Sequence, residues 1–351
     1  MSTPTYRLLG GPGSPYSLKL RAALRYRRLP HVWVVPQGYI NQGGELAAAG
    51  KTTIPVLQLP EDGRYWADST PILYALEQRH PGQRSLIPSD PADAFLAHLI
   101  EDFADELLVL PMFAHRWGFE ADRQFCPRRQ LTGWMGAAPT ATFEAYVAQF
   151  TQRQVNLMQA LGGMENLPLY EHIYHGVLRQ IETLLTEQRY LFGTQPSLAE
   201  MGLFGQLSQC AIDSTASDYM KRNAPRAFQW VQDLDDASGV DGAWRQPGEA
   251  APAALAGLLA LVVQTYLPYA EAQVEAVQRG EQQISVALAG MPFTGSVRPY
   301  TATSLLWLKD EYAQLDDVAR ARVDSLLGSA AADMLRWREG EAQLVPPHVP
   351  A

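Results

Sequence analysis

The stretch TTIPVLQLPEDGRYWADSTPILYALEQRHP, residues 52–81, decides the fold of the first part of the chain. Two β-rich segments, 54–59 and 64–66, flank the sequence Pro60-Glu61-Asp62-Gly63, whose residue types are typical of a hairpin turn. The sequence Ser69-Thr70-Pro71 then provides a hydroxyl cap and a proline in the first turn of a helix. The stretch therefore predicts an antiparallel strand pair followed by a helix.

The residues before this stretch predict a parallel strand pair. Residues 6–9 form a short apolar strand, and the sequence GSPYSLKLRAALRYRRLP (13–30) contains a helix that begins with Ser14 as N-cap and ends before Pro30. A second strand follows at 31–35. Because two strands joined through a helix pair in parallel and a hairpin pairs antiparallel, we expect a mixed sheet in an α/β domain at residues 1–84.

The remaining residues predict helices. Residues 90–240 show the 3.6-residue apolar period of an all-α domain, and Pro111 is expected to kink or end its first long helix. An insertion near 118–165 begins with a Gly- and Pro-rich part, 118–142, that predicts irregular structure. After a linker, residues 250–345 predict an extension of helices and one hairpin, packed on the helical domain.

Composition excludes several classes of protein. The chain has 351 residues, 28 Lys and Arg against 37 Asp and Glu, and 47% hydrophobic residues, so it is globular and too acidic for a nucleic-acid binder. Two cysteines, Cys126 and Cys210, cannot form a disulfide framework, and the N-terminus lacks signal-peptide features. We therefore expect a cytoplasmic protein. The uncharged stretch 250–270 is interrupted by Pro and Gly, which favours a buried helix over a membrane span.

Two groups of charged residues are interpreted as solvated helix faces. They are the cationic cluster of Lys19, Arg21, Arg25, Arg27 and Arg28, and the acidic cluster of Asp102, Asp105 and Glu106. Two pairs of potential metal ligands, His172/His175 and His98/Asp102, have helical spacing. Neither has a third ligand, so no metal site is predicted.

Ser14 is the first candidate for chemistry. A helix N-terminus presents unpaired N–H groups and a partial positive charge, which favour an anion or a thiolate. Since no cysteine stands in this turn, disulfide exchange is excluded, but a hydroxyl can donate to a ligand's thiolate. An ordinary Ser-Pro cap would have the same sequence. The preceding Gly10-Gly11-Pro12-Gly13 matches neither nucleotide-binding loop pattern.

Two further motifs point to a ligand site. Pro55 at the entry of a strand indicates a sheet edge, a bulge or a cis bond, and a cis bond would leave the backbone of Ile54 available to an extended peptide. Asp68 and Ser69 at a second helix N-terminus suit a ligand with an ammonium and a carboxylate. A trans proline and an ordinary helix cap are the alternatives.

Together the three motifs resemble the cytosolic glutathione S-transferase family. The resemblance rests on residues 13–30, 52–81 and 190–207 (YLFGTQPSLAEMGLFGQL), and it covers residues 5–235. It implies a thioredoxin-like N-terminal domain, an all-α domain and, as in one bacterial branch, a long C-terminal extension. The chain is similar to the serine-type members of the family.

The resemblance implies a role for each motif. Ser14 would stabilise the thiolate of glutathione, with Tyr16 and Ser17 as alternative hydroxyls. The remaining glutathione contacts would come from residues 51–69. Ile54 and Pro55 would pair with its cysteinyl backbone, Asp68 and Ser69 would hold its γ-glutamyl group, and Lys51 is a possible contact to its glycyl carboxylate.

The implied reaction is attack of the thiolate on an electrophilic small molecule. The acceptor pocket is expected between the domains, with an apolar or aromatic substrate and an anionic group near Arg116. Its expected lining is Tyr16, Phe103, Met112, His115, Arg116 and Trp117. Isomerisation, dehalogenation and ether cleavage are variants of this chemistry. The expected partners are glutathione, the electrophile and a second copy in a homodimer, without nucleic acid, membrane or metal. The alternative function is a binding or scaffolding protein with little turnover.

Overall fold

In the computed structural model of the protein, which describes residues 4–36, 44–82, 84–338, 340, 341 and 348–350, the N-terminal part folds around a mixed four-stranded sheet. The strand order is β2-β1-β3-β4; β1 pairs parallel with β2 and antiparallel with β3. The predicted α/β fold class of the N-terminal domain, the thioredoxin-like arrangement, is therefore confirmed. Its elements are β1 (Tyr6–Leu9), α1 (Pro15–Tyr26), β2 (His31–Val34), α2 (Gly44–Ala48), β3 (Val56–Gln58), β4 (Tyr65–Ala67) and α3 (Ser69–Arg79).

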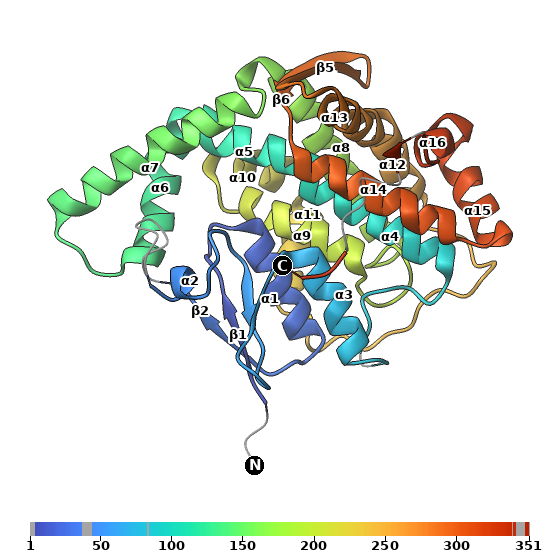
Figure 1. The fold of residues 1–351 in the computed structure, drawn as a ribbon, viewed down its shortest axis with the longest axis horizontal. Coiled ribbons are helices and arrows are strands. Elements are labelled where there is room, and N and C mark those ends of the chain that lie inside the picture. Colours follow the sequence, from blue (N-terminus) through green and yellow to red (C-terminus); the bar gives the residue numbers. More distant parts are fainter. Residues whose placement is uncertain (1–3, 37–43, 83, 339, 342–347, 351) are drawn as a thin grey trace.

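The central part of the chain is helical, as predicted. Its helix α9 packs on α1 of the N-terminal domain (Figure 1). Its elements are α4 (Pro91–Phe103), η1 (Ala104–Leu108), α5 (Val109–Gly118), α6 (Glu120–Met135), α7 (Thr140–Ala160), η2 (Met164–Asn166), α8 (Leu167–Glu187), α9 (Leu198–Cys210), α10 (Ser214–Asn223) and α11 (Pro225–Asp235). A capping box begins α9, where Ser197 caps the backbone and Glu200 accepts from the backbone N–H of Ser197.

One prediction for this part is wrong, and of the two alternatives for Pro111 the helix end is excluded. The stretch 118–142 is not irregular, because α6 and α7 form a helical hairpin that stands at one side of the molecule (Figure 1). Pro111 does not end its helix either; the π-helical turn η1 lies directly before it, and α5 continues to Gly118. The same order recurs in the extension, where the π-helical turn η3 (Val262–Tyr266) precedes Pro268 in α13 (Leu267–Arg279). A proline cannot donate the regular helical hydrogen bond, and a widened turn accommodates that loss.

The extension packs on the helical domain, with α12 on α8 and α14 on α4 (Figure 1). Its elements are α12 (Ala253–Leu261), η3 (Val262–Tyr266), α13 (Leu267–Arg279), β5 (Gln283–Leu288), β6 (Met291–Ser296), α14 (Pro299–Gln314), α15 (Asp317–Leu327) and α16 (Ser329–Met334). The predicted hairpin is β5–β6. The chain end also returns to the N-terminal domain, where His348 packs against Tyr74 of α3.

The helix that continues from Ala253 to Arg279 is long and apolar enough to cross a membrane by length and composition alone. In this structure 61% of its most apolar window is buried inside the protein. This agrees with the predicted buried helix.

The interpretation of the charged clusters as solvated faces is wrong for all their residues except Arg28, which is exposed. Lys19 is fully buried and Arg27 almost so, while Arg21 and Arg25 both pair with Asp235 of the helical domain. The acidic cluster is also buried. Its residues, Asp102, Asp105 and Glu106, are each no more than 5% exposed. The charges of α1 thus join the N-terminal domain to the helices rather than face water.

Candidate functional site

One cavity of about 520 Å³ lies where the N-terminal domain, the helical domain and the extension meet. A volume of this size is ordinary for a small-molecule site. Nine of the residues predicted for the two sites line it, and they come from segments far apart in the sequence. They are Ser14, Tyr16, Ile54, Pro55, Asp68, Ser69, Met112, Arg116 and Trp117.

Ser14 stands at the N-terminus of α1, beside this cavity. Its extended backbone, with φ −99° and ψ 117°, directs the Oγ back to accept from the backbone N–H of Ser17 at 3.2 Å. In the part of the chain that the structure describes, the hydroxyl proton of Ser14 has no acceptor. The group can therefore still donate to a ligand, in the field of the helix N-terminus.

The two alternative hydroxyls are placed differently. The Tyr16 hydroxyl donates to the backbone carbonyl of Asp105 at 3.0 Å, and burial, together with Glu106 and Asp105, raises its pKa well above the usual range. Ser17 is fully buried and does not line the cavity. Of the three hydroxyls, Ser14 is the one with a proton to donate into the cavity.

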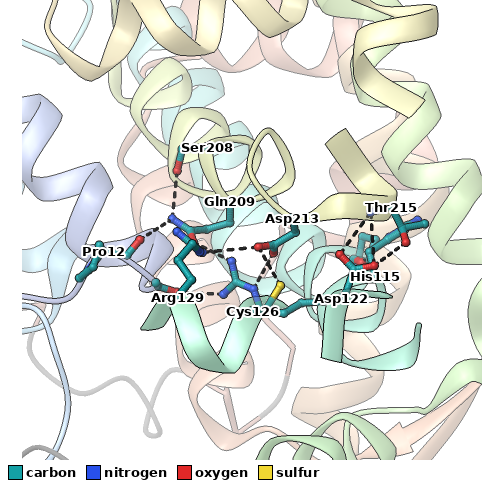
Figure 2. Close-up of polar contacts among 12 residues, drawn as sticks. Pro12, His115, Asp122, Cys126, Arg129, Ser208, Gln209, Asp213 and Thr215 are labelled. Atoms are coloured by element: carbon teal, nitrogen blue, oxygen red, sulfur yellow. Dashed lines mark hydrogen bonds and ion pairs between the residues drawn. The ribbon is translucent and has the colours of Figure 1, made fainter. Parts of the chain in front are cut away.

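The loop before Ser14 is held by a buried polar network. Gln209 of α9 donates to the carbonyl of Pro12 at 3.2 Å, and Asp213 accepts from the Cys126 thiol at 3.2 Å and from Arg129 at 3.4 Å (Figure 2). Arg116 donates to the Gly13 carbonyl at 2.9 Å. This network fixes the position at which α1 begins.

Arg116 was predicted to face an anionic group of the substrate, and its contacts correct this. The guanidinium is 2% exposed and donates to the carboxylate of Asp213 at 2.6 Å and to Gln209 at 2.6 Å, besides Gly13. Asp213 holds the pKa of Arg116 above its usual range against the effect of burial. With its charge already paired, Arg116 positions the loop rather than binding an anion.

The second predicted ligand segment lies on the opposite side of the cavity. The peptide bond between Ile54 and Pro55 is cis, as the resemblance implied, and both residues line the cavity. Lys51 does not line the cavity, so the structure gives no support to its predicted contact.

Asp68 has a positive φ of 77° at the start of α3, and its side chain makes no cap hydrogen bond. This backbone conformation is uncommon for a residue other than glycine and is found at functional sites. Its Oδ2 accepts from the Tyr300 hydroxyl of the extension at 2.5 Å. Burial raises the pKa of Asp68. An acid predicted to hold a ligand's ammonium is thus engaged by another segment of its own chain.

A buried ion cluster lies behind Ser69. The Lys19 ammonium, 0% exposed, donates to Thr70 at 2.9 Å, to Asp105 at 2.6 Å, and to Glu101. Burial alone would lower the pKa of Lys19, but Asp105 and Glu101 reverse this effect and raise it. Burial raises the pKa of Asp105 to about 7, although Lys19 lowers it, and the neighbouring Glu101 carboxylate adds to the rise.

The apolar part of the cavity is formed by α5, α6 and α7. Met112 and Trp117 were predicted here, and the structure adds Phe113 from α5, Trp134 from α6, which was predicted irregular, and Leu157 from α7. The polar side chains of Gln130, Arg153 and Gln154 line the same part of the cavity. Phe103 and His115 do not line the cavity, which corrects their prediction. Phe103 is a fully buried core residue, and the His115 ring bonds to the carbonyl of Pro111 at 2.7 Å.

Sequence reasoning missed the contribution of the extension. Arg298, Tyr300, Ser304 and Trp307 line the cavity, and Arg298 pairs with Glu106 at 3.1 Å. No local signal could have identified these residues, because their partners lie about 200 positions earlier in the chain. Among the described residues there is no group of three His, Cys, Asp or Glu side chains that could hold a metal ion.

Comparison with known proteins gives a family match for the N-terminal domain. Residues 8–84 match the family described as glutathione S-transferase, N-terminal domain. Glutathione S-transferase U8 of Arabidopsis thaliana is 26% identical over 118 residues, which are 34% of this chain and 53% of that protein. The chain thus spans about half the length of this curated relative.

Several solved structures are similar to the chain at low identity. A glutathione S-transferase from Rhodospirillum rubrum F11 has 21% identity and a TM-score of 0.41, with 72% of this chain and 91% of that one covered. One from Methylobacterium radiotolerans, in complex with glutathione sulfonate, has 20% identity and a TM-score of 0.42, with 70% and 98% covered. The beta-etherase LigF from Sphingobium sp. strain SYK-6 has 22% identity and a TM-score of 0.47, with 67% and 97% covered.

Proposed function

Since the chain belongs to the glutathione S-transferase family through its N-terminal domain, we propose that it binds glutathione in this cavity and activates the thiol for attack on an electrophile. The observation that carries the proposal is the Ser14 hydroxyl, which has an unused proton at a helix N-terminus inside the cavity. Ile54, Pro55, Asp68 and Ser69 line the same cavity and are proposed to hold the tripeptide.

The proposed chemistry requires a thiolate at neutral pH. A free thiol has a pKa near 8.5, and lowering it by about 2 units takes roughly 2.7 kcal/mol of preferential thiolate stabilisation. A hydrogen bond from Ser14 to a charged sulfur contributes about 1.5–3 kcal/mol, and a helix terminus contributes up to about 2 kcal/mol. The two effects together are sufficient. The sulfur then bonds to the electrophilic carbon, whose leaving group departs with the bonding electron pair.

Ser14→Ala tests this role directly. We expect the variant to bind glutathione but to lose the ultraviolet absorbance of the bound thiolate, because the hydroxyl donor is missing. Tyr16→Phe is the matched control: its hydroxyl already donates to Asp105, so the thiolate absorbance should persist. Unchanged absorbance in Ser14→Ala, or its loss in Tyr16→Phe, would reassign the donor.

The Tyr300–Asp68 contact favours a second candidate function, a binding or scaffolding protein with little turnover. In this arrangement Tyr300 engages the acid proposed to receive the γ-glutamyl ammonium. Thermal unfolding with glutathione separates the two functions, because a bound ligand stabilises the folded chain by RT ln(1 + [L]/Kd). A rise in melting temperature with millimolar glutathione supports the transferase, and no rise supports the scaffold.

A further inference from the structure

The chain end packs against two residues of the cavity wall. The His348 ring stacks on the Trp307 ring of α14, with centroids 4.2 Å apart and an interplanar angle of 25°. It is also parallel to the His98 ring of α4, at 5.8 Å and 6°, and tilted against Tyr74 of α3 at 5.1 Å. Trp307 and His98 line the cavity, but His348 does not. His348 therefore supports the wall from outside the cavity and joins α3, α4 and α14.

A separate anchor holds the preceding part of the chain on α14. Lys309 donates to both oxygens of Glu341, at 2.9 and 2.8 Å, and both side chains are buried. A buried pair of this kind is costly to break. His348 is held differently, since its ring makes the contacts and its buried Nε2 has no hydrogen-bond partner. Loss of the His348 contacts should therefore leave the Lys309–Glu341 anchor in place.

A series of contacts leads from His348 to Asp68. Trp307 contacts the Tyr300 ring edge-on, with centroids 5.9 Å apart and an interplanar angle of 82°. The Tyr300 hydroxyl donates to Asp68 at 2.5 Å. Tyr300 is 42% exposed, so much of its ring has no neighbour to restrain it. The position of the Trp307 ring, which His348 covers, therefore affects how firmly Tyr300 stays on Asp68.

We propose that His348 is a positioning residue that holds Tyr300 on Asp68 by stacking on Trp307, so that release of the chain end frees Asp68 for the ammonium of glutathione. The inference rests on the proposed glutathione function and names a regulation of that site. An aromatic pair changes an equilibrium by a factor of roughly 2 to 12. Removal of the His348 ring should therefore tighten glutathione binding by about threefold, less than removal of the Tyr300 hydroxyl itself.

The surroundings of His348 make this contact sensitive to acid. The charged and titratable groups that face it come from four helices: His98 and Glu101 of α4, Glu311 of α14, Lys19 of α1 and Tyr74 of α3. Burial alone would lower the pKa of His98, but Glu311, bonded to its Nδ1 at 2.8 Å, raises it to about 9. His98 is therefore a cation at neutral pH.

Burial and the charge of His98 lower the pKa of His348 to about 4, against the opposing effect of Glu311. A released His348 has the ordinary pKa near 6.5, so it takes up a proton more readily than the stacked one. The stack is consequently at full strength above about pH 6.5 and weakens as pH falls towards 4. Between pH 7.5 and pH 5 the equilibrium should shift roughly 30-fold towards release.

Three variants test the proposal. His348→Ala removes the ring, His348→Phe keeps a ring that stacks but takes no proton, and Val349→Ala changes the exposed neighbour as a control. Calorimetry measures glutathione binding at pH 7.5 and pH 5, and hydrogen exchange of α14 peptides is followed by mass spectrometry without ligand.

At pH 7.5 we expect His348→Ala to bind glutathione about threefold tighter and its α14 peptides to exchange faster, while His348→Phe and Val349→Ala match wild type. At pH 5 the affinity of wild type should approach that of His348→Ala, and His348→Phe should remain the weaker binder. In a Tyr300→Phe background, His348→Ala should have no further effect on affinity, because the bond to Asp68 is already absent.

The other outcomes separate this proposal from the glutathione function. Equal affinities of wild type and His348→Ala, or an undiminished effect in the Tyr300→Phe background, would overturn the positioning role. If wild type binds no glutathione at either pH, the proposed function fails, and hydrogen exchange alone decides: faster exchange in His348→Ala but not in His348→Phe supports the hold on α14, and equal exchange refutes it. If His348→Ala does not fold, the comparison of His348→Phe with wild type at pH 5 gives the same decision.

Discussion

Replacing Lys19 with Met removes the cation that donates to both carboxylates of a buried cluster, in which His98 lies 4.0 Å from Glu101. In the wild type Lys19 donates to both Glu101 and Asp105, and Glu101 is fully buried. Because the pKa of Asp105 is already about 7 in the wild type, the folded variant must keep a second carboxyl of the cluster protonated as well. At pH 7 this costs about 1.36 × 3, or roughly 4 kcal/mol, for a group with an ordinary pKa near 4. The free energy of unfolding should fall by about 3–5 kcal/mol, as for other broken buried pairs.

The pH dependence of this loss is a separate test. The folded variant binds one proton more than the wild type relative to the unfolded chain, so its stability relative to wild type falls as pH rises above the carboxyl's unfolded pKa. At pH 5 the extra cost is only about 1.4 kcal/mol. Urea unfolding followed by circular dichroism at pH 5 and pH 7 measures both values.

Arg25→Met is the matched control for this experiment. Arg25 lies on the same helix, and its pair with Asp235 is partly exposed, so its loss should cost less than about 1 kcal/mol. A Lys19→Met variant within 1 kcal/mol of wild type at pH 7, or with the same loss at both pH values, would refute the reasoning. Such a result would mean that water reaches the cluster.

Two further substitutions test the other interactions. Ser197→Ala should lower the free energy of unfolding by about 1–2 kcal/mol in urea titrations, because it removes the Oγ that accepts from the backbone N–H of Ala199 and donates to Glu200; a change below about 0.3 kcal/mol would contradict the capping argument. Tyr300→Phe should tighten glutathione binding about tenfold in calorimetry, because Asp68 no longer has to release a hydrogen bond before it receives the ammonium; weaker binding would instead identify the Tyr300 hydroxyl as a contact of the ligand.

The sequence predicted the N-terminal fold well because its signals are local. The starts of α1 and α3 are indicated by adjacent residues, Ser14-Pro15 and Asp68-Ser69, and the hairpin turn separates its two strands by a few residues; the short helix α2 was not predicted. The observed order β1-α1-β2 and β3-β4-α3 follows these signals closely. The cavity residues from these starts were identified for the same reason.

Charge alone did not reveal which polar residues are buried. Lys19 and Asp105 are 86 positions apart, and each has a sequence context typical of a solvated helix face. Only the folded chain, in which Lys19 of α1 reaches Asp105 of η1, pairs them, and the two charges satisfy each other in the interior. Sequence periodicity carries no information on such a partner, so the polar floor of the cavity could not be predicted.

The helix α6 was missed because tertiary contacts override its composition. Pro127 and Gly133 argue against a helix, and the sequence predicts a loop. In the folded chain Gly133 lies against Pro12, and Gln130 and Trp134 lie against the loop at Gly11 and Gly13, so the small residues allow the helix to approach α1 closely. Gly133 lowers the helix propensity of this segment, and it also allows the close approach of α6 that places Gln130 beside Ser14.

The extension determines how the transferase and scaffold functions are separated. Arg298 pairs with Glu106 and Tyr300 bonds to Asp68, so the extension contacts both an acid of the helical domain and one of the N-terminal domain. The extension forms part of the cavity wall. A ligand that binds there must either displace these two contacts or bind beside them. The Arg298–Glu106 pair leaves the region around Ser14 untouched, whereas the Tyr300–Asp68 bond engages the acid proposed for the ammonium. We therefore propose that the Tyr300 hydroxyl decides between the two proposed functions, because it occupies Oδ2 of Asp68, one of the two oxygens that could accept the ammonium.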